Sequence, residues 1–210
     1  MVRKTKEEAE RTRKEIIEAA RRTFHQYGVS RSTCERIAKA AGVTRGAVYW
    51  HFKDKAEIFF AMREDVFRPL IERTDALLYA ERFADPLDAI EASLTEFFRV
   101  LDDCAVVREV FEIMISRCEY VDEFASVQLE VGRPALDFLD KMQRMYCKAA
   151  ELGTLRPGLD PLAMAQDTWA FTSGLLNLLL GCQSGSDLGQ RIPGMIATHM
   201  AVRRGERASR

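Results

Sequence analysis

The chain has 210 residues, of which 47% are hydrophobic and 30% charged, and its formal net charge is −1 at pH 7. This length is enough for one large or two small domains with a folded core. No apolar run approaches the roughly 20 residues of a membrane-spanning helix, and the charged N-terminus lacks a signal-peptide core, so we expect a cytoplasmic protein.

The near-neutral total conceals a charge asymmetry along the chain. Residues 1–60 contain 14 Lys and Arg against 8 Asp and Glu, a net charge of +6, and the remainder contains 17 against 24, a net charge of −7. A basic N-terminal part on an acidic body is typical of a protein that meets phosphate at one end. Six prolines and few alternating β-type runs favour an all-α fold.

The first residues form a basic tail. Residues 1–8 include Arg3, Lys4 and Lys6 and lack an apolar anchor, so we expect no fixed structure there in the free protein. The tail is either a solubilising terminus or a basic arm that lies along DNA. Apolar residues then recur at three- and four-residue spacing over residues 12–27, which predicts an amphipathic helix that ends at Gly28.

Two short helices joined by a tight turn follow. Ser32 and Glu35 have the Ser-x-x-Glu spacing of a capping box, which predicts a helix start. Gly42 can adopt the positive φ that ends a helix, and Thr44 can cap another helix two residues later. A further capped start at Asp54 limits this second helix to roughly two turns.

The second of these helices concentrates aromatic and cationic side chains, and a helix of its size fits the major groove of DNA. There Arg45 can bind a guanine, Ala47 can contact a thymine methyl, and Gly46 lets the backbone come close. Other side chains suit phosphate contacts, which fix register without reading sequence. These are Tyr49, Trp50, His51 and Lys55, and the predicted DNA-binding set also includes Ser32, Thr33 and Thr44.

The stretch from Thr44 to Lys55, Thr-Arg-Gly-Ala-Val-Tyr-Trp-His-Phe-Lys-Asp-Lys, resembles the recognition-helix signature of the TetR family of transcriptional repressors. Residues 3–9 and 49–52 are more particular and resemble the AcrR/TtgR-like branch, which represses multidrug efflux pumps. Cys34 departs from this branch, which commonly has a larger aliphatic residue at that position.

The resemblance implies two domains. Residues 1–54 would form a three-helix helix-turn-helix domain, and residues 55–210 a larger helical domain for ligand binding and dimerisation. The expected protein is a repressor that binds a palindromic operator as a homodimer, is released by small hydrophobic compounds, and controls an efflux pump operon. The alternatives are a TetR-type regulator of another pathway and a regulator that senses oxidants through its cysteines.

Proline residues mark the predicted helices of the second part. One long helix from Asp54 contains Pro69, which predicts a kink. An Asp-Pro pair at residues 85–86 and another at residues 160–161 each indicate an N-cap followed by the first helical residue. A longer helix from Asp122 is either kinked or divided at residues 132–134.

The helix predicted over residues 161–180 has almost no polar face, so it must be covered on all sides. One side can pack inside the domain, and the simplest cover for the other side is a second copy of the chain. A final helix over residues 188–203 would complete a four-helix contact between two subunits. The TetR resemblance implies the same homodimer.

Methionines and aromatics crowd the helices after residue 86 and are either ordinary core or the walls of an adaptable cavity. The resemblance favours a ligand pocket there, and the absence of polar residues at two of its positions points to a hydrophobic ligand. Its implied lining is Ile90, Leu94, Phe97, Phe111, Ile115, Phe138, Met142, Trp169, Ser173 and Leu176.

Motifs of an enzyme are absent from the sequence. The three histidines lie in no nucleophile motif or metal-spaced cluster, no glycine-rich phosphate loop is present, and five cysteines without a Cys-x-x-Cys pair argue against a zinc site. Glu112 and Glu119 are the one conceivable carboxylate pair and are more simply solvated acids. We therefore expect no catalytic residue, no cofactor and no bound metal.

Overall fold

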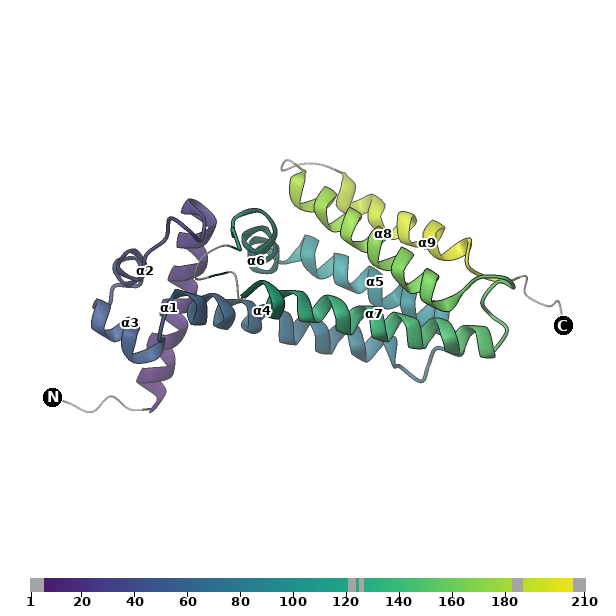
Figure 1. Ribbon diagram of the computed structural model, residues 1–210, viewed down its shortest axis with the longest axis horizontal. Helices are drawn as coiled ribbons and strands as arrows, with labels where there is room; N and C mark the ends of the chain where they lie inside the picture. Colours follow the sequence, from purple (N-terminus) through teal and green to yellow (C-terminus); the bar gives the residue numbers. More distant parts are fainter. Residues whose placement is uncertain (1–5, 121–123, 125–126, 183–186, 206–210) are drawn as a thin grey trace. The chain divides into compact units, whose positions relative to one another are not determined.

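The computed structural model describes residues 6–120, 124, 127–182 and 187–205 of the chain (Figure 1). Over these residues the chain folds into nine α-helices, with one isolated backbone bridge between Leu155 and Arg204. The all-α fold expected from the sequence is confirmed. Among the described residues, no helix combines the length and the hydropathy that crossing a bilayer requires.

The chain divides into two compact units, which are described separately. Unit 1 comprises Met1–Arg68 and Ala105–Glu130, and unit 2 comprises Pro69–Cys104 and Val131–Arg210. Two helices, α4 (Lys55–Leu78) and α7 (Val127–Glu151), contribute residues to both units. The functional division after residue 54 that the sequence suggests stays a prediction.

Unit 1 contains α1 (Lys6–Tyr27), α2 (Cys34–Ala41), α3 (Arg45–His51), the first part of α4, and α6 (Ala105–Ser116). Each helix contributes apolar side chains to its core. The ring of Phe59 on α4 lies 6.2 Å from that of Phe24 on α1 and 5.6 Å from that of Phe124 (centroid distances). Other fully buried core residues are Ile16, Ile37, Val48, Ile58, Val110 and Ile113.

The turn between α2 and α3 follows the sequence prediction. Gly42 has φ +69° and its N–H donates to the carbonyl of Lys39 at 3.2 Å, so it ends α2 in the left-handed conformation. The predicted capping box before α2, with Ser32 as the N-cap, is wrong. The N-cap is Thr33, whose hydroxyl accepts from the Arg36 N–H at 3.1 Å, whereas Ser32 turns inward.

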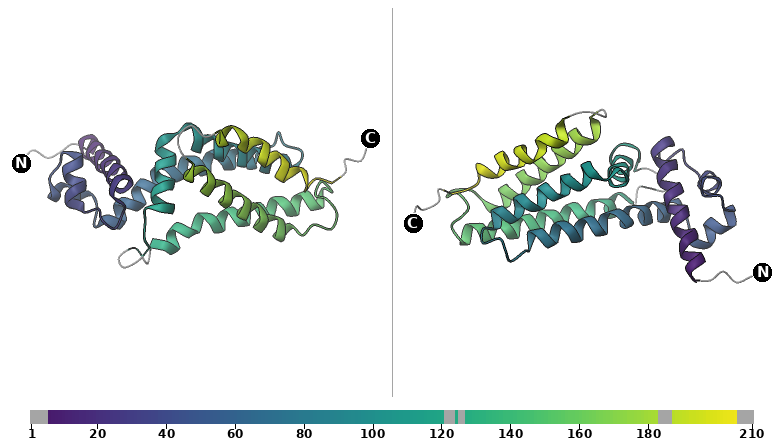
Figure 2. Two further views of the ribbon diagram at one scale, coloured as in Figure 1. Left: turned by 90° about the horizontal axis from the view of Figure 1, so that it is seen from above. Right: turned by 180° about the vertical axis from the view of Figure 1, so that it is seen from behind.

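Unit 2 is a bundle built from α5 (Pro86–Asp103), α8 (Pro161–Gly181), α9 (Leu188–Ala201) and the parts of α4 and α7 assigned to it (Figure 2). The two predicted Asp-Pro starts are confirmed. Asp85 accepts from the Leu87 N–H at 2.9 Å, and Asp160 accepts from the Ala163 N–H at 2.8 Å.

Helix α9 packs on α5 and is held near both of its ends. At its start, a Cβ at position 189 would overlap the Asp102 carboxylate, so any other residue here would displace that side chain. Beyond its end, Arg204 forms ion pairs with three acids of the α5 N-terminal region at 2.6–3.2 Å, which are Asp85, Asp88 and Glu91. The Gly205 N–H also donates to the Thr154 carbonyl at 2.9 Å.

Several predicted boundaries differ from the structure. Helix α1 begins at Lys6, so residues 6–8 are helical and do not belong to an unstructured tail. Helix α7 runs unbroken through residues 132–134, so the chain is not divided there, and the predicted start at Asp122 lies outside the described residues. Pro69 lies inside α4 as expected, and a kink at this residue stays a prediction.

A buried polar chain joins α7, α8 and α9. The Tyr146 hydroxyl lies 2.7 Å from the Thr168 hydroxyl, which lies 3.3 Å from Nε2 of His199. The His199 ring stacks on Phe171 with centroids 3.8 Å apart. Burial, followed by the positive charge of Arg203, lowers the pKa of His199 to about 4, so the ring is neutral near pH 7.

His199 therefore makes the stability of the protein depend on acidity. A histidine in the unfolded chain has a pKa of about 6.5. Between that value and the folded value of about 4, only the unfolded state binds the proton. This contribution is fully present above the unfolded pKa and is lost as the pH falls to the folded pKa.

We expect His199→Phe, which keeps a ring against Phe171, to reduce the fall in unfolding free energy between pH 7 and pH 4 by on the order of 1–3 kcal/mol. Urea unfolding of both proteins across this range measures it. The range from pH 7 to pH 8 is the internal control, since the two proteins should show the same slope there. Equal slopes below pH 6.5 would contradict the assignment.

Candidate nucleic-acid interface

Helix α3 is short and is oriented by its ends. The Thr44 hydroxyl accepts from the Ala47 N–H at 3.1 Å and caps the helix. Val48 is the buried residue of α3, and Phe52, which follows the helix, is 2% exposed. These two apolar anchors face the core of unit 1 and leave the other side of α3 to solvent.

The exposed side of α3 carries most of the predicted DNA-contacting residues. Arg45 and Gly46 are exposed, and the exposed fractions of Tyr49 and Trp50 are 46% and 69%. Ala47 and His51 are half-buried, with the His51 ring edge-on to Trp50 at 4.5 Å between centroids. Two large aromatic side chains are therefore exposed beside a cation, and neither is needed for the core of unit 1. Their contact with DNA stays a prediction.

The start of α2 belongs to the same surface. A hydrogen bond with Tyr49 raises the pKa of Arg45 above its ordinary value, and weaker contributions come from Glu35 and Cys34 at the start of α2. Thr33, the cap of α2, is exposed. The first turns of α2 and α3 are thus electrostatic neighbours, and both present helix N-terminal amides, which favour anions.

Two residues of the predicted DNA-binding set have buried side chains. Ser32 is 1% exposed, and its hydroxyl donates to the Gly28 carbonyl at 2.6 Å. Lys55 is 9% exposed, and its ammonium donates to the Val29 carbonyl at 3.0 Å. Both side chains support the α1–α2 turn from inside unit 1, so neither is available to a phosphate in this arrangement.

Two arginines near the α1–α2 turn were not included in the predicted set. Arg36 lies over the Tyr27 ring, 4.4 Å from its centroid, and donates to the Arg31 carbonyl at 3.0 Å. Arg31 donates to the Tyr27 carbonyl at 2.9 Å. Both are exposed cations beside the α2 cap. Their position on either side of Thr33 in the sequence was the signal that could have identified them.

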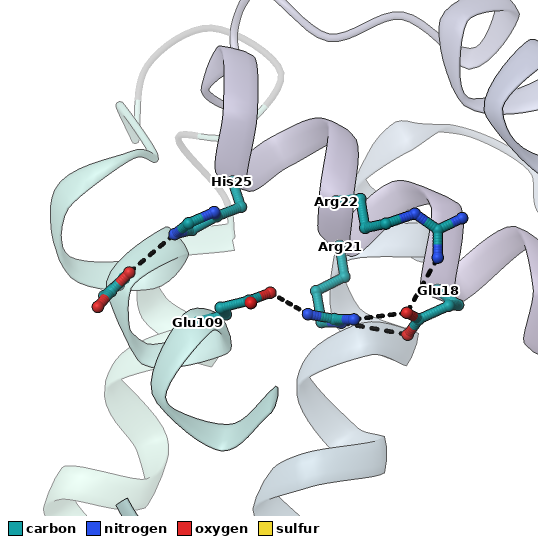
Figure 3. A network of polar contacts seen from close by, with 6 residues as sticks. Glu18, Arg21, Arg22, His25 and Glu109 are labelled. Atoms are coloured by element: carbon teal, nitrogen blue, oxygen red, sulfur yellow. Dashed lines mark hydrogen bonds and ion pairs between the residues drawn. The ribbon is translucent and has the colours of Figure 1, made fainter. Parts of the chain in front are cut away.

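An ion-pair network joins α6 to α1 inside unit 1 (Figure 3). The Arg21 guanidinium, which is largely buried, lies between the carboxylates of Glu18 on α1 and Glu109 on α6. Further along α1, Nε2 of His25 lies 2.8 Å from the Glu112 carboxylate of α6. The hydrogen bond with Arg21 lowers the pKa of Glu18. Helix α6 is therefore fixed to the helix that underlies α2 and α3.

The residues proposed to line a ligand pocket are divided between the two units. In unit 2, Phe138 and Trp169 bring their rings within 5.7 Å of each other. In unit 1, Phe111 stacks on Phe67 at 4.8 Å between centroids, and Ile115 is 41% exposed. The remaining predicted lining residues lie on α5, α7 and α8 of unit 2, buried or half-buried, and are Ile90, Leu94, Phe97, Met142, Ser173 and Leu176.

An exposed apolar surface lies on α8 and α9 of unit 2. On α8, Leu178 is 55% exposed, while Leu175 and Leu179 are each 2% exposed. An open hollow of about 600 Å³ lies on these two helices, and its lining includes Phe171, Met195 and His199. A second hollow, of about 630 Å³ beside α5, is lined largely by charged side chains such as Glu91 and Arg204. Neither hollow contains a predicted pocket residue.

Two capped helices joined by a glycine turn, the second one short and exposed, define a helix-turn-helix regulator of transcription. Residues 16–62 match the family model described as bacterial regulatory proteins, tetR family. The chain belongs to the TetR family of transcriptional regulators, and the protein is not an enzyme.

Relatives in this family match nearly the whole chain. The transcriptional regulator TtgR of Pseudomonas putida is 37% identical over 191 residues, which cover 90% of this chain and 89% of TtgR. The crystal structure of NalD, the secondary repressor of the MexAB-OprM multidrug efflux pump in Pseudomonas aeruginosa, is 30% identical. It superimposes with a TM-score of 0.83 and covers 96% of this chain and 100% of NalD.

A third relative was solved with a small molecule. The complex of SmeT with triclosan has a TM-score of 0.79 and 30% identity and covers 95% of this chain and 94% of that one. SmeT is the repressor of the Stenotrophomonas maltophilia multidrug efflux pump SmeDEF. This chain is thus related to regulators of multidrug efflux pumps over both of its units.

We expect Lys55→Ala to destabilise the protein by about 1–3 kcal/mol, because the buried Val29 carbonyl loses its ammonium donor. Urea unfolding measures the loss. Lys53→Ala, at an exposed neighbouring cation, is the control and should change the unfolding free energy by less than about 0.5 kcal/mol. An unchanged stability together with a shallower salt dependence of DNA binding would instead support a phosphate contact by Lys55.

Proposed function

We propose that this protein is a repressor that binds a palindromic operator as a homodimer and is released by small hydrophobic compounds. The regulated operon would encode a multidrug efflux pump. The proposal assigns the exposed side of α3 and the cap of α2 to DNA, the helices of unit 2 to the ligand, and the apolar surface of α8 and α9 to the second subunit. Helices α4 and α7, which contribute to both units, are the candidates for transmission.

The observation that carries the proposal is an exposed glycine within the recognition helix. Glycine costs about 1 kcal/mol relative to alanine inside a helix. A Cβ at Gly46 would meet only the Thr44 hydroxyl at 3.9 Å, an ordinary van der Waals distance, and the position has no left-handed φ. The fold of unit 1 therefore does not require glycine here. Glycine is required here if the backbone of α3 must approach a partner such as a DNA groove more closely than a Cβ would allow.

The charges of the chain agree with this assignment. The net charge of +6 lies in residues 1–60, which contain α1, α2 and α3. Arg45 at the first position of α3 can bind a guanine edge, and Thr33, Thr44, Tyr49, Trp50 and His51 can contact phosphates. Exposed Arg31 and Arg36 extend this basic surface to the α1–α2 turn.

A hydrophobic ligand agrees with the composition of unit 2. The predicted lining on α5, α7 and α8 has one polar member, Ser173, and otherwise consists of aliphatic, methionine and aromatic side chains. Release requires that the ligand favour an arrangement of two subunits whose recognition helices no longer match one turn of DNA. A coupling of about 1–3 kcal/mol weakens DNA binding several- to a hundredfold.

The test begins with the DNA upstream of the gene. Footprinting should give a protected site with twofold symmetry, and the affinity for it should fall steeply with salt. Lipophilic drugs, triclosan and plant phenolics should then release the protein under reducing conditions. Release by oxidant alone would favour cysteine sensing instead. Burial raises the pKa of the Cys118 thiol to about 11, which disfavours the reactive thiolate at that cysteine.

We expect Gly46→Ala to separate folding from function. The variant should be as stable as the wild type or more stable by up to about 1 kcal/mol, because alanine favours the helix. Its affinity for the operator should fall at least tenfold, because the added methyl group keeps the backbone from the groove. Thermal unfolding and fluorescence anisotropy measure the two effects. Undiminished operator affinity would remove the central support of the proposal.

We expect a charge in the α8–α9 surface to prevent dimerisation. Leu178→Glu places a carboxylate at an exposed leucine of that surface and should give a folded monomer with weak operator binding, since a buried unpaired charge costs several kcal/mol. Leu136→Glu, at a leucine of α7 that is 68% exposed, is the matched control and should remain a dimer. Analytical ultracentrifugation measures both. A dimeric Leu178→Glu protein would place the interface elsewhere.

A further inference from the structure

Arg45 and Tyr49 contact each other across one turn of α3. Residues four apart on a helix are neighbours on its surface, and here the guanidinium carbon lies 5.4 Å from the centroid of the tyrosine ring. Both side chains are exposed, so core packing does not impose this contact. The contact is a property of the surface proposed to meet DNA.

The hydroxyl group of Tyr49 takes part as well. A side-chain hydrogen bond with Tyr49 makes the largest contribution to the raised pKa of Arg45. A guanidinium has only donors, so the phenolic oxygen is the acceptor. The hydroxyl keeps its own hydrogen, which can still be donated to another acceptor. One tyrosine can therefore bind the arginine and a phosphate oxygen at the same time.

An arginine held in this way has fewer orientations to lose when it binds a base. A free arginine side chain has considerable rotamer entropy. Its planar guanidinium forms two hydrogen bonds to a base only when it is correctly oriented, so a preset orientation reduces the entropy lost on binding. The contact with the ring therefore reduces the number of orientations open to the guanidinium, and the hydrogen bond with the hydroxyl adds to this effect. The N-cap at Thr44 fixes the helical backbone beneath both residues.

We infer that Tyr49 is a positioning residue for Arg45, so that base reading by the arginine depends on the tyrosine beside it. This inference rests on the proposed function and adds a dependence between two residues that were assigned separate roles. If Tyr49 only contacted phosphate, it would contribute equally to operator and random DNA, with or without Arg45. If it positions Arg45, its contribution to specificity disappears when Arg45 is absent.

A double-mutant cycle on specificity distinguishes these two roles. The measured quantity is the ratio of affinities for the footprinted operator and a random duplex, at one salt concentration, for wild type, Arg45→Ala, Tyr49→Phe and the double variant. Arg45→Ala should lower the ratio about 5- to 150-fold. Tyr49→Phe, which keeps the ring, should lower it at least about twofold in the wild type and not at all in Arg45→Ala.

Trp50 supplies the matched control. It is the other exposed aromatic of α3, and its ring contacts that of His51. Trp50→Phe should change the specificity ratio by the same factor with and without Arg45. A third variant, Tyr49→Leu, removes the ring as well and should lower the ratio further than Tyr49→Phe. Circular dichroism confirms that each variant is folded.

The outcomes separate the inference from the function on which it rests. Two results would overturn the positioning role and leave operator binding intact. One is an equal loss of the ratio from Tyr49→Phe in the wild type and in Arg45→Ala, and the other is a ratio for the Arg45→Ala single variant equal to that of the wild type. A wild-type protein that does not distinguish the operator from random DNA would overturn the proposed function itself.

Discussion

The recognition helix buries too little apolar surface to fix its own position. Contacts with the rest of unit 1 hold it in place. Helix α3 has seven residues and buries one of them, Val48. A helix of two turns is unstable alone in water. Its direction therefore depends on the Gly42 turn before it, the Thr44 cap and the buried Phe52 that follows. A helix that exposes most of its side chains has a fixed orientation only if the residues around it hold it in place.

That support extends beyond the helix-turn-helix itself. Both backbone polar groups of Val29 are hydrogen-bonded, since its N–H donates to the Arg117 carbonyl at 2.8 Å and its carbonyl accepts from Lys55. Arg117 directly follows α6, and the side-chain contacts of Arg21 with Glu109 and of His25 with Glu112 also join α1 to α6. Residues far along the sequence thus complete the unit that carries the recognition helix, and any displacement of α6 acts on α1 and on the α1–α2 turn.

The sequence predicted those features of the fold that depend on residues close together in the chain. The Asp-Pro caps, the Gly42 turn, the short exposed helix and the all-α class follow from neighbouring residues, and the structure has them. Ser32 and Thr33 are adjacent hydroxyl residues, so spacing alone could not show which one caps α2. The burial of Lys55 depends on a carbonyl 26 residues away, and the polar contacts of α6 with α1 span 87 and 88 residues. Such contacts leave no periodic pattern in a single sequence.

The ion pairs of Arg204 also have a consequence for the order in which the chain becomes complete during synthesis. Unit 1 needs nothing beyond Glu130, so it can close while the remainder is still being translated. Unit 2 cannot, because Arg204 forms ion pairs with acids at the start of α5 that are translated up to 119 residues earlier. A nascent chain therefore contains all the residues of unit 1 before unit 2 can close.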